Sequence, residues 1–462
     1  MGRLTRRVLA VVAAGGLLLG RVPVTSAADW VQFGTPTAES SFGAGVLFSQ
    51  PVTVAKSAGR VELLLTVADA IGPTVIVVPD PPGAGSTTLT QGAGEGGVGG
   101  FLPNTQLVAR WRLVAADDPT DVQVGPEIRV TYADDRFAWK TEAGDVVRVH
   151  WTEGSDAFGK RALRIAEDAI DETSTLLGVT ESEPIDFYIY ADGDAFRDAI
   201  GPGVRENVGG LAVAGIRTLF AHIAPGQIDD AWVGVVIPHE LTHLVFDTAS
   251  GNPYHFPPHW LNEGVADYVS QGYTPSYRAK VRDASRSGTL IPLDGLTGQF
   301  PTTSDRFLLA YAESVSAVDY LVRTYGKDAL VGLIRSYADG RTDDEAFSAA
   351  LGVDMTAFAA AWLDDVDAKA PTRYGPQPAP AGPVPAAWAG SPGGGLISPP
   401  PTAASAAPTP TEATSPVPGV IGGSGVAEVP AWAAPVVALI AVVVVLSLFV
   451  GARRNRASVG TS

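Results

Sequence analysis

The stretch His239-Glu240-Leu241-Thr242-His243, followed by Trp260-Leu261-Asn262-Glu263-Gly264, decides how this chain is interpreted. Residues four apart lie on one face of a helix, so His239 and His243 can present two imidazoles to one metal ion. Glu240, next to the first ligand, can accept a proton from a water without occupying a coordination position. Catalytic zinc uses three protein ligands and leaves the fourth position open, and Glu263 can supply the third from a second helix.

Three further features favour a metal site over an ordinary amphipathic helix with surface histidines. The chain has 6 His, and His239, His243, His255 and His259 fall within one short window. The segment that carries Glu263 follows at a spacing that lets a second helix return to the first. Asp267 lies four residues after Glu263 on the same helical face, where it can accept a hydrogen bond from a ligand imidazole. The pattern predicts a His/His/Glu zinc site for metal-assisted hydrolysis, in the first place of peptide bonds.

The same residues carry a resemblance to a known family. HELTH together with WLNEGVADY (260–268) resembles the gluzincin metallopeptidases, which include thermolysin and the aminopeptidase N family, and is most similar to the smaller peptidase MA-like proteins of bacteria. The resemblance implies that zinc is held by His239, His243 and Glu263, that Glu240 acts as general base and acid, and that Asp267 orients a ligand. It covers about residues 136 to 370 and is strongest over 237–268.

Two further features bear on the type of peptidase. The segment Leu309–Ser314 is similar to the one in which aminopeptidase relatives carry a transition-state tyrosine, so Tyr311 is the candidate for stabilising the oxyanion. An aromatic side chain at a helix start can equally serve only in packing. The chain has no Gly-x-Met-Glu-Asn segment, which in aminopeptidase relatives binds the free amine of the substrate. Endopeptidase action is therefore slightly favoured over aminopeptidase action.

Pro238 lies directly before His239, so the sequence does not decide where the helix that carries His239 and His243 begins. Proline is tolerated in the first helical turn but removes a hydrogen bond further along. The helix either begins near Ile237, or an earlier helix from Asp230 kinks at the proline.

The expected fold class is α+β, with a gluzincin-type catalytic domain over 136–372, built from a small mixed sheet plus helices, preceded by a β-sandwich-like domain over 29–135. The glycine-rich stretch Gly83–Gly100 is predicted to be a mobile loop. The predicted strands of the first domain are 61–67, 74–78, 105–113 and 128–132. In the catalytic domain we expect strands at 145–151, 185–190 and 217–223, and helices at 156–177, from near 192, 260–270, 306–325, 328–337, 343–351 and 355–365. His150 is expected in a strand, and His255 and His259 in the loop between the two ligand helices.

Both ends of the chain predict a membrane protein. Residues 1–28 have the basic start, the apolar run and the small-residue end of a signal peptide. A linker rich in Pro, Ala and Ser is expected over 373–429, where the composition predicts a disordered stalk. Residues 430–452 are predicted to form one C-terminal transmembrane helix, followed by a basic cytoplasmic tail at 453–462. The expected location is therefore the cell membrane, single-pass, with the catalytic part extracellular.

Composition sets the remaining limits. The chain contains no Cys, which excludes disulfides and thiolate metal ligands. Its net charge of -17 argues against nucleic acid as a partner. The expected partners are a peptide or protein substrate and the membrane, and the oligomeric state stays open. The alternatives are a catalytically silent surface module that keeps the fold for binding, and a zinc hydrolase of non-peptide amides.

Overall fold

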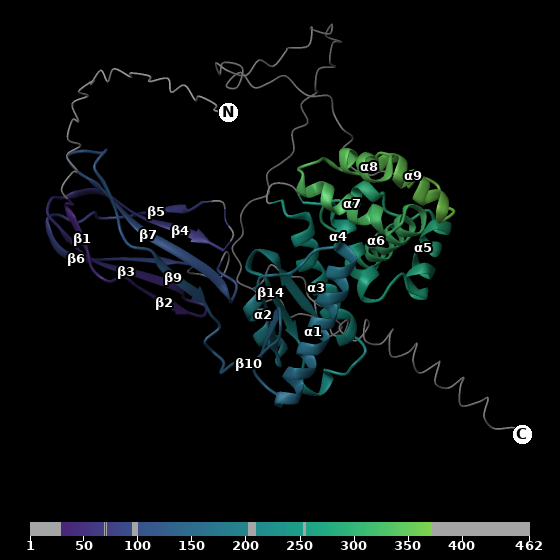
Figure 1. Cartoon of the computed structure of the whole chain (residues 1–462), viewed down its shortest axis with the longest axis horizontal. Helices are drawn as coiled ribbons and strands as arrows, with labels where there is room; N and C mark the ends of the chain where they lie inside the picture. Colours follow the sequence, from purple (N-terminus) through teal and green to yellow (C-terminus); the bar gives the residue numbers. More distant parts are fainter. Residues whose placement is uncertain are drawn as a thin grey trace, which may run out of the picture. The chain divides into compact units, whose positions relative to one another are not determined.

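The computed structural model describes residues 29–371 except 69, 71, 95–99, 202–208 and 253–255. The chain divides into two compact units. The first comprises the described residues within Met1–Glu167 and Ser182–Ile228, and the second those within Asp168–Glu181 and Asp229–Ser462. The first unit holds the strands (Figure 1), and the second holds the described helices from α3 onward. The predicted signal peptide, linker, transmembrane helix and tail lie outside the described residues.

Two antiparallel sheets of the first unit share one apolar core. One sheet has the order β1-β3-β2, with β6 also paired to β3, and the other has the order β5-β4-β7-β8, with β9 also paired to β7. Alternate residues of the long strands point inward, and side chains such as Phe48, Leu63 and Trp111 from both sheets are completely buried. The strands are β1 (Val31–Phe33), β2 (Thr37–Ser41), β3 (Gly45–Val54), β4 (Ala58–Val67), β5 (Thr74–Val78), β6 (Gly85–Ala93), β7 (Thr105–Ala115), β8 (Val122–Val124) and β9 (Ile128–Tyr132).

Strand β6 corrects the prediction of a mobile loop over Gly83–Gly100. Residues Gly85–Ala93 pair with β3 along its length, from Gly85 opposite Val54 to Ala93 opposite Val46. The glycines gather at the ends of this strand, while its middle is rich in threonine, a β-branched residue that suits a strand. The prediction of a loop was therefore wrong for Gly85–Ala93, because it was based on glycine content alone.

The mixed sheet of the same unit has the order β10-β11-β12-β14-β13. Its central strands β11, β12 and β14 run parallel, and β10 and β13 are antiparallel edge strands. His150 lies in β11, as the alternation predicts. The elements are β10 (Lys140–Ala143), β11 (Val147–Trp151), α1 (Asp156–Leu177), β12 (Ile185–Tyr190), α2 (Gly193–Ile200), β13 (Gly210–Val213) and β14 (Thr218–His222).

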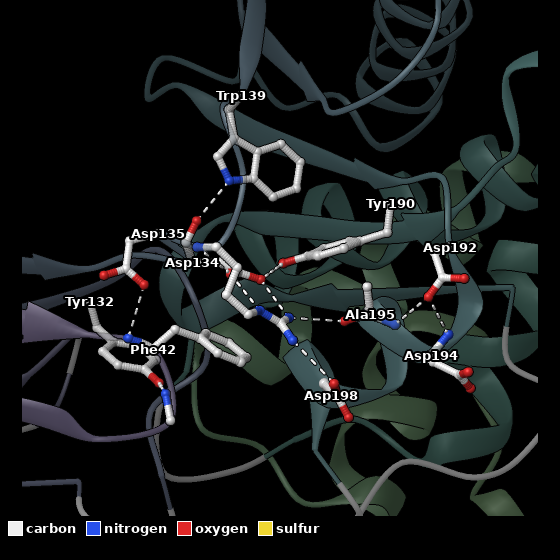
Figure 2. A network of polar contacts seen from close by, with 12 residues as sticks. Phe42, Tyr132, Asp134, Asp135, Trp139, Tyr190, Asp192, Asp194, Ala195 and Asp198 are labelled. Atoms are coloured by element: carbon white, nitrogen blue, oxygen red, sulfur yellow. Dashed lines mark hydrogen bonds and ion pairs between the residues drawn. The ribbon is translucent and has the colours of Figure 1, made fainter.

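A buried ion pair fixes the segment between β9 and β10. Figure 2 shows the Asp134 carboxylate, which accepts hydrogen bonds from the Arg136 guanidinium at 2.9 and 2.8 Å and from the Tyr190 hydroxyl at 3.0 Å. The same guanidinium donates to Asp198 at 3.1 Å and lies 3.8 Å from the centre of the Phe42 ring. The Asp134 side chain is fully buried, so water does not stabilise its negative charge and these hydrogen-bond donors do so instead.

The second unit is a packed group of helices. The ligand-bearing helices are α3 (Val233–Ser250) and α4 (His259–Ser270), and α4 packs against α6 (Ser304–Tyr325) where Gly264 approaches the Ser314 carbonyl. Trp260, Phe347 and Phe358 fill the core on the far side of α4, with Trp260 and Phe358 stacked at 6.1 Å. The remaining helices are α5 (Pro275–Ser287), α7 (Lys327–Ala338), α8 (Asp343–Leu351) and α9 (Met355–Asp365).

None of the helices that the structure describes is by itself long and apolar enough to cross a membrane, and only the bent pair α8 and α9, at 65° to each other, meets the length and composition criteria together.

Candidate metal centre

Helix α3 carries the two histidines and runs through the proline. It begins at Val233, so Pro238 lies inside the helix. This excludes a start near Ile237 and agrees with the alternative of an earlier helix that continues past the proline, although the helix starts three residues after Asp230. The proline has no N–H to donate to the carbonyl one turn earlier. Its own carbonyl accepts the Thr242 hydroxyl at 2.7 Å. Ile237 and Leu241 anchor the apolar face of the helix in the core, which leaves His239 and His243 on another face.

The three predicted ligands converge. One nitrogen or oxygen atom from each of His239, His243 and Glu263 lies within 4.8 Å of the others. The two Nε2 atoms are 3.3 Å apart, and Glu263 Oε2 is 3.3 Å from His239 Nε2 and 3.7 Å from His243 Nε2. Glu263 Oε2 is buried without a well-formed hydrogen bond among the described residues. A buried oxygen near two imidazole nitrogens and without a hydrogen bond of its own is suited to bind a cation together with them.

The Nε2 atom of each ligand imidazole faces the centre, and its Nδ1 atom contacts a neighbouring side chain. His239 Nδ1 lies 3.2 Å from Asp267 Oδ1, and His243 Nδ1 lies 2.8 Å from Asn262 Oδ1. These partners are acceptors, so each Nδ1 carries a proton and each Nε2 faces the centre, where a bound metal ion would take the place of any proton on it. Asp267 occupies the position expected for an orienting carboxylate. Asn262 was missed by the sequence reasoning, although it stands directly before the third ligand in the quoted segment.

The imidazoles and the carboxylates of the site shift each other's pKa values. Burial alone would lower the pKa of His239, but the Asp267 and Glu263 carboxylates raise it well above its usual value. Burial would raise the pKa of Glu263, yet the His243 and His239 imidazoles lower it to about 2. Glu263 is therefore an anion at any physiological pH, and the site carries the negative charge that a cation needs.

Tyr311 reaches the same site from α6. Its ring centre lies 6.2 Å from that of His239, so its hydroxyl belongs to the surroundings of the ligands. Burial, together with the charges of Glu263, Asp267 and Glu240, raises the pKa of Tyr311 well above its usual value. The hydroxyl thus stays protonated and remains a hydrogen-bond donor. Glu240, half-buried on α3, is one of these charges.

His259 lies nearer the site than expected. It is the first residue of α4 and not a loop residue, and its backbone N–H donates to Thr297 O at 2.9 Å. Its Nε2 lies 3.5 Å from Glu263 Oε1, and its ring packs edge-on against Phe300 at 4.5 Å. The spacing of four residues to Glu263 was the available signal. His255 lies outside the described residues.

The donor set fits zinc. Two neutral imidazole nitrogens and one carboxylate oxygen are the ligands of a catalytic zinc site, with a fourth position left for water or substrate. Thiolates are excluded because the chain has no Cys.

The family comparison agrees with this site. Residues 165–368 match the sequence family described as the Peptidase MA superfamily. This part of the chain is a peptidase MA superfamily domain, and His239, His243 and Glu263 form a zinc site of the gluzincin type. The coarse activity that follows is that of a zinc metallopeptidase.

Similar solved structures were also found. An aminopeptidase N family protein from Idiomarina loihiensis is 10% identical over 71% of this chain and 74% of its own, with a TM-score of 0.38. An M1 zinc metallopeptidase from Deinococcus radiodurans is 15% identical over 76% of this chain and 97% of its own, with a TM-score of 0.33. Similarity at this level does not bear on activity. Among curated proteins, no significant match was found.

Proposed function

We propose that this zinc metallopeptidase hydrolyses internal peptide bonds of a peptide or protein substrate, with Glu240 as general base and acid and Tyr311 as the oxyanion donor. One observation carries the proposal. The ligand atoms of His239, His243 and Glu263 converge within 4.8 Å, inside a domain of the peptidase MA superfamily. Glu240 lies directly after His239 on the same helix.

The side chains divide the chemistry between them. Zinc, when bound, supplies Lewis acidity and lowers the pKa of water in the site. Glu240 accepts a proton from the attacking water as the water oxygen bonds to the carbonyl carbon. It then delivers that proton to the amine nitrogen as the carbon–nitrogen bond breaks. One carboxylate thus serves both halves of the hydrolysis and returns to its starting state.

Tyr311 is suited to the developing oxyanion. Its hydroxyl is a permanent donor, because burial and the surrounding carboxylates raise its pKa. Donors that are already in place when charge develops stabilise a transition state without reorganisation.

Endopeptidase action is the favoured mode. The chain lacks the Gly-x-Met-Glu-Asn segment that binds the free amine of the substrate in aminopeptidase relatives. A peptide library in free and N-acetylated form tests this. We expect cleavage at internal bonds at comparable rates in both forms. Release of single N-terminal residues from the free form only would show an aminopeptidase instead.

The alternatives have distinct results in the same assay. A silent binding module would hold zinc but release no product from any peptide. A hydrolase of non-peptide amides would leave the library intact and act on small amide substrates. The matched control is Glu240→Gln, which should bind zinc as the wild type does and cleave nothing detectable.

We also propose that the enzyme works on the outer face of a membrane. The support is the sequence alone: a signal-like start at 1–28, an apolar stretch at 430–452 and arginines at 453, 454 and 456. Protease added to intact cells should release a soluble fragment of about residues 29 to 375 that keeps zinc and activity. A fragment that stays protected until lysis would contradict this orientation.

A further inference from the structure

Two neighbouring parallel strands of the mixed sheet end beside each other and lead to opposite faces of the sheet. Strand β11 leads into α1, and β12 leads into α2. Helix α1 covers the face that carries Trp151, since a Cβ at Gly159 would lie 2.5 Å from the Trp151 ring. Tyr190 follows the register partner of Trp151 and so points to the opposite face, where Phe196 of α2 packs with it. Such a divergence at the carboxyl ends of parallel strands leaves a crevice in which α/β proteins bind ligands.

A cavity of about 260 Å³ lies at these strand ends. Its lining contains two aromatic residues, Phe137 and Tyr190, and three residues with hydrogen-bond acceptors, Thr152, Glu153 and Asp192. Pockets for drug-sized molecules span roughly 300–1,000 Å³. The cavity therefore suits a smaller ligand or a single long side chain.

The hydrogen-bond donors at this cavity are already engaged. The guanidinium of Arg136, which also belongs to the lining, donates to Asp134, to Asp198 and to the Ala195 carbonyl at 3.3 Å. The Tyr190 hydroxyl donates to Asp134 at 3.0 Å. An anionic ligand would meet few free donors here and would be repelled by the carboxylates of the lining.

The acceptors are held in place without being used up. Asp192 accepts the backbone N–H groups of Asp194 and Ala195 at 3.0 and 2.9 Å with Oδ1 (Figure 2), which leaves Oδ2 for a ligand. The loop that carries Glu153 is fixed by Lys140, whose Nζ donates to the next carbonyl along it at 2.8 Å. Within the part of the chain that the structure describes, the Glu153 side chain makes no hydrogen bond or ion pair of its own. Both carboxylates are exposed and so available to a ligand.

We propose that this cavity binds a small organic cation, a primary ammonium or guanidinium group on an apolar stem. The cation donates hydrogen bonds to Glu153 and Asp192, and its stem packs against the rings of Phe137 and Tyr190. A free alkylamine and the lysine or arginine side chain of a peptide share this chemistry. The site belongs to the first unit and depends on neither the zinc ligands nor the peptidase reaction.

Calorimetric titration of the full chain tests the recognition of charge. The probes are n-butylamine as a free amine, N-acetyl-lysine amide as a peptide side chain, and N-acetyl-norleucine amide as the uncharged control. We expect the amines to bind with a Kd on the order of 1 mM, and the uncharged amide at least about 10-fold more weakly. The same affinities are expected with zinc and with a chelator. Saturable binding of only one amine supports the proposal and identifies the source of the cation.

Variants assign the binding to the cavity. Glu153→Gln combined with Asp192→Asn removes both charges but keeps an oxygen for the cap of α2, and should weaken amine binding at least about 10-fold. Asp194→Asn is the matched control, because it changes the same charge on the same helical turn outside the lining, where Asp194 pairs with Arg197. It should bind within about twofold of wild type. Should the double variant fail to fold, Ala138→Leu narrows the cavity from an exposed position of the lining and should also weaken binding.

Four results would overturn the proposal. They are the absence of saturable binding by either amine, equal affinity for the norleucine amide, equal losses in Asp194→Asn and the double variant, and binding that disappears with the chelator. The last of these would place the amine at the zinc site instead.

Discussion

Gly264, directly after the zinc ligand Glu263, marks a close approach of α4 to α6. A Cβ at this position would lie 2.6 Å from the Ser314 carbonyl oxygen and 2.8 Å from both the Ser314 carbonyl carbon and Val318 Cγ2. Ordinary contacts of a Cβ begin at 3.4 Å. Since the nearest atom belongs to the backbone, it cannot rotate away. Gly264→Ala therefore forces the two helices apart by roughly 0.8 Å along this direction.

The size of the effect follows from two opposing terms. Overpacking in a close-packed core costs about 1–3 kcal/mol, and contact with rigid backbone places this case at the upper end. Alanine regains about 1 kcal/mol over glycine in a helix interior. We expect the free energy of unfolding to fall by about 1–2 kcal/mol. Zinc affinity should fall as well, because the displaced helix carries Glu263.

Denaturant unfolding of the metal-free chain measures the first effect. Gly332→Ala in α7 is the control, because the nearest atom to its added Cβ, Ala350 Cβ, lies 3.9 Å away. This variant should be more stable than wild type by up to about 1 kcal/mol. If Gly264→Ala is as stable as wild type, the close crossing of α4 and α6 is wrong.

Three further predictions concern single side chains. Glu240→Gln should keep zinc but lower the turnover of a cleaved peptide by at least ~10²-fold, and turnover within a fewfold of wild type would remove Glu240 from its role. His259→Leu removes the imidazole 3.5 Å from Glu263 Oε1 and should weaken zinc binding about 3- to 10-fold in chelator competition, whereas an unchanged Kd would show that this contact does not position the ligand. Glu313, fully buried in α6, accepts the Ile291 N–H with both oxygens, and burial raises its pKa to about 8. The unfolded chain loses this proton near pH 4.5 and the folded chain only near pH 8, so stability should fall across that window by on the order of a few kcal/mol. Glu313→Gln keeps an acceptor for Ile291 and should flatten the decline in denaturant unfolding at pH 5, 7 and 9; an unchanged slope would contradict the buried carboxyl.

The sequence predicted best the features that depend on spacing. The ligand set follows from residues four apart on one helix and a third ligand on the next, and the three atoms converge as expected. Helices α1, α8 and α9 have the predicted bounds, and the side chains of Thr342 and Asp354 cap the N-termini of α8 and α9.

Helix α5 was not predicted, and its sequence explains why. Of its residues only Val281 and Ala284 are buried, so its sequence lacks the apolar periodicity that indicates an amphipathic helix. The helical path through Pro238 was one of two alternatives that the sequence left open, since proline normally indicates a helix boundary.

The nearness of the three ligands in the chain has a consequence for folding. All of them lie within the span His239–Glu263, on two helices joined by a short connection, and Asp267 follows one turn later. Closing so short a loop costs little chain entropy, so α3 and α4 can meet before contacts distant in sequence form. A metal that binds this pair early would act as a nucleus around which α6 then docks, and zinc should accelerate refolding in stopped-flow measurements. Equal rates with zinc and with chelator would mean that the helices assemble first and that the ion arrives last.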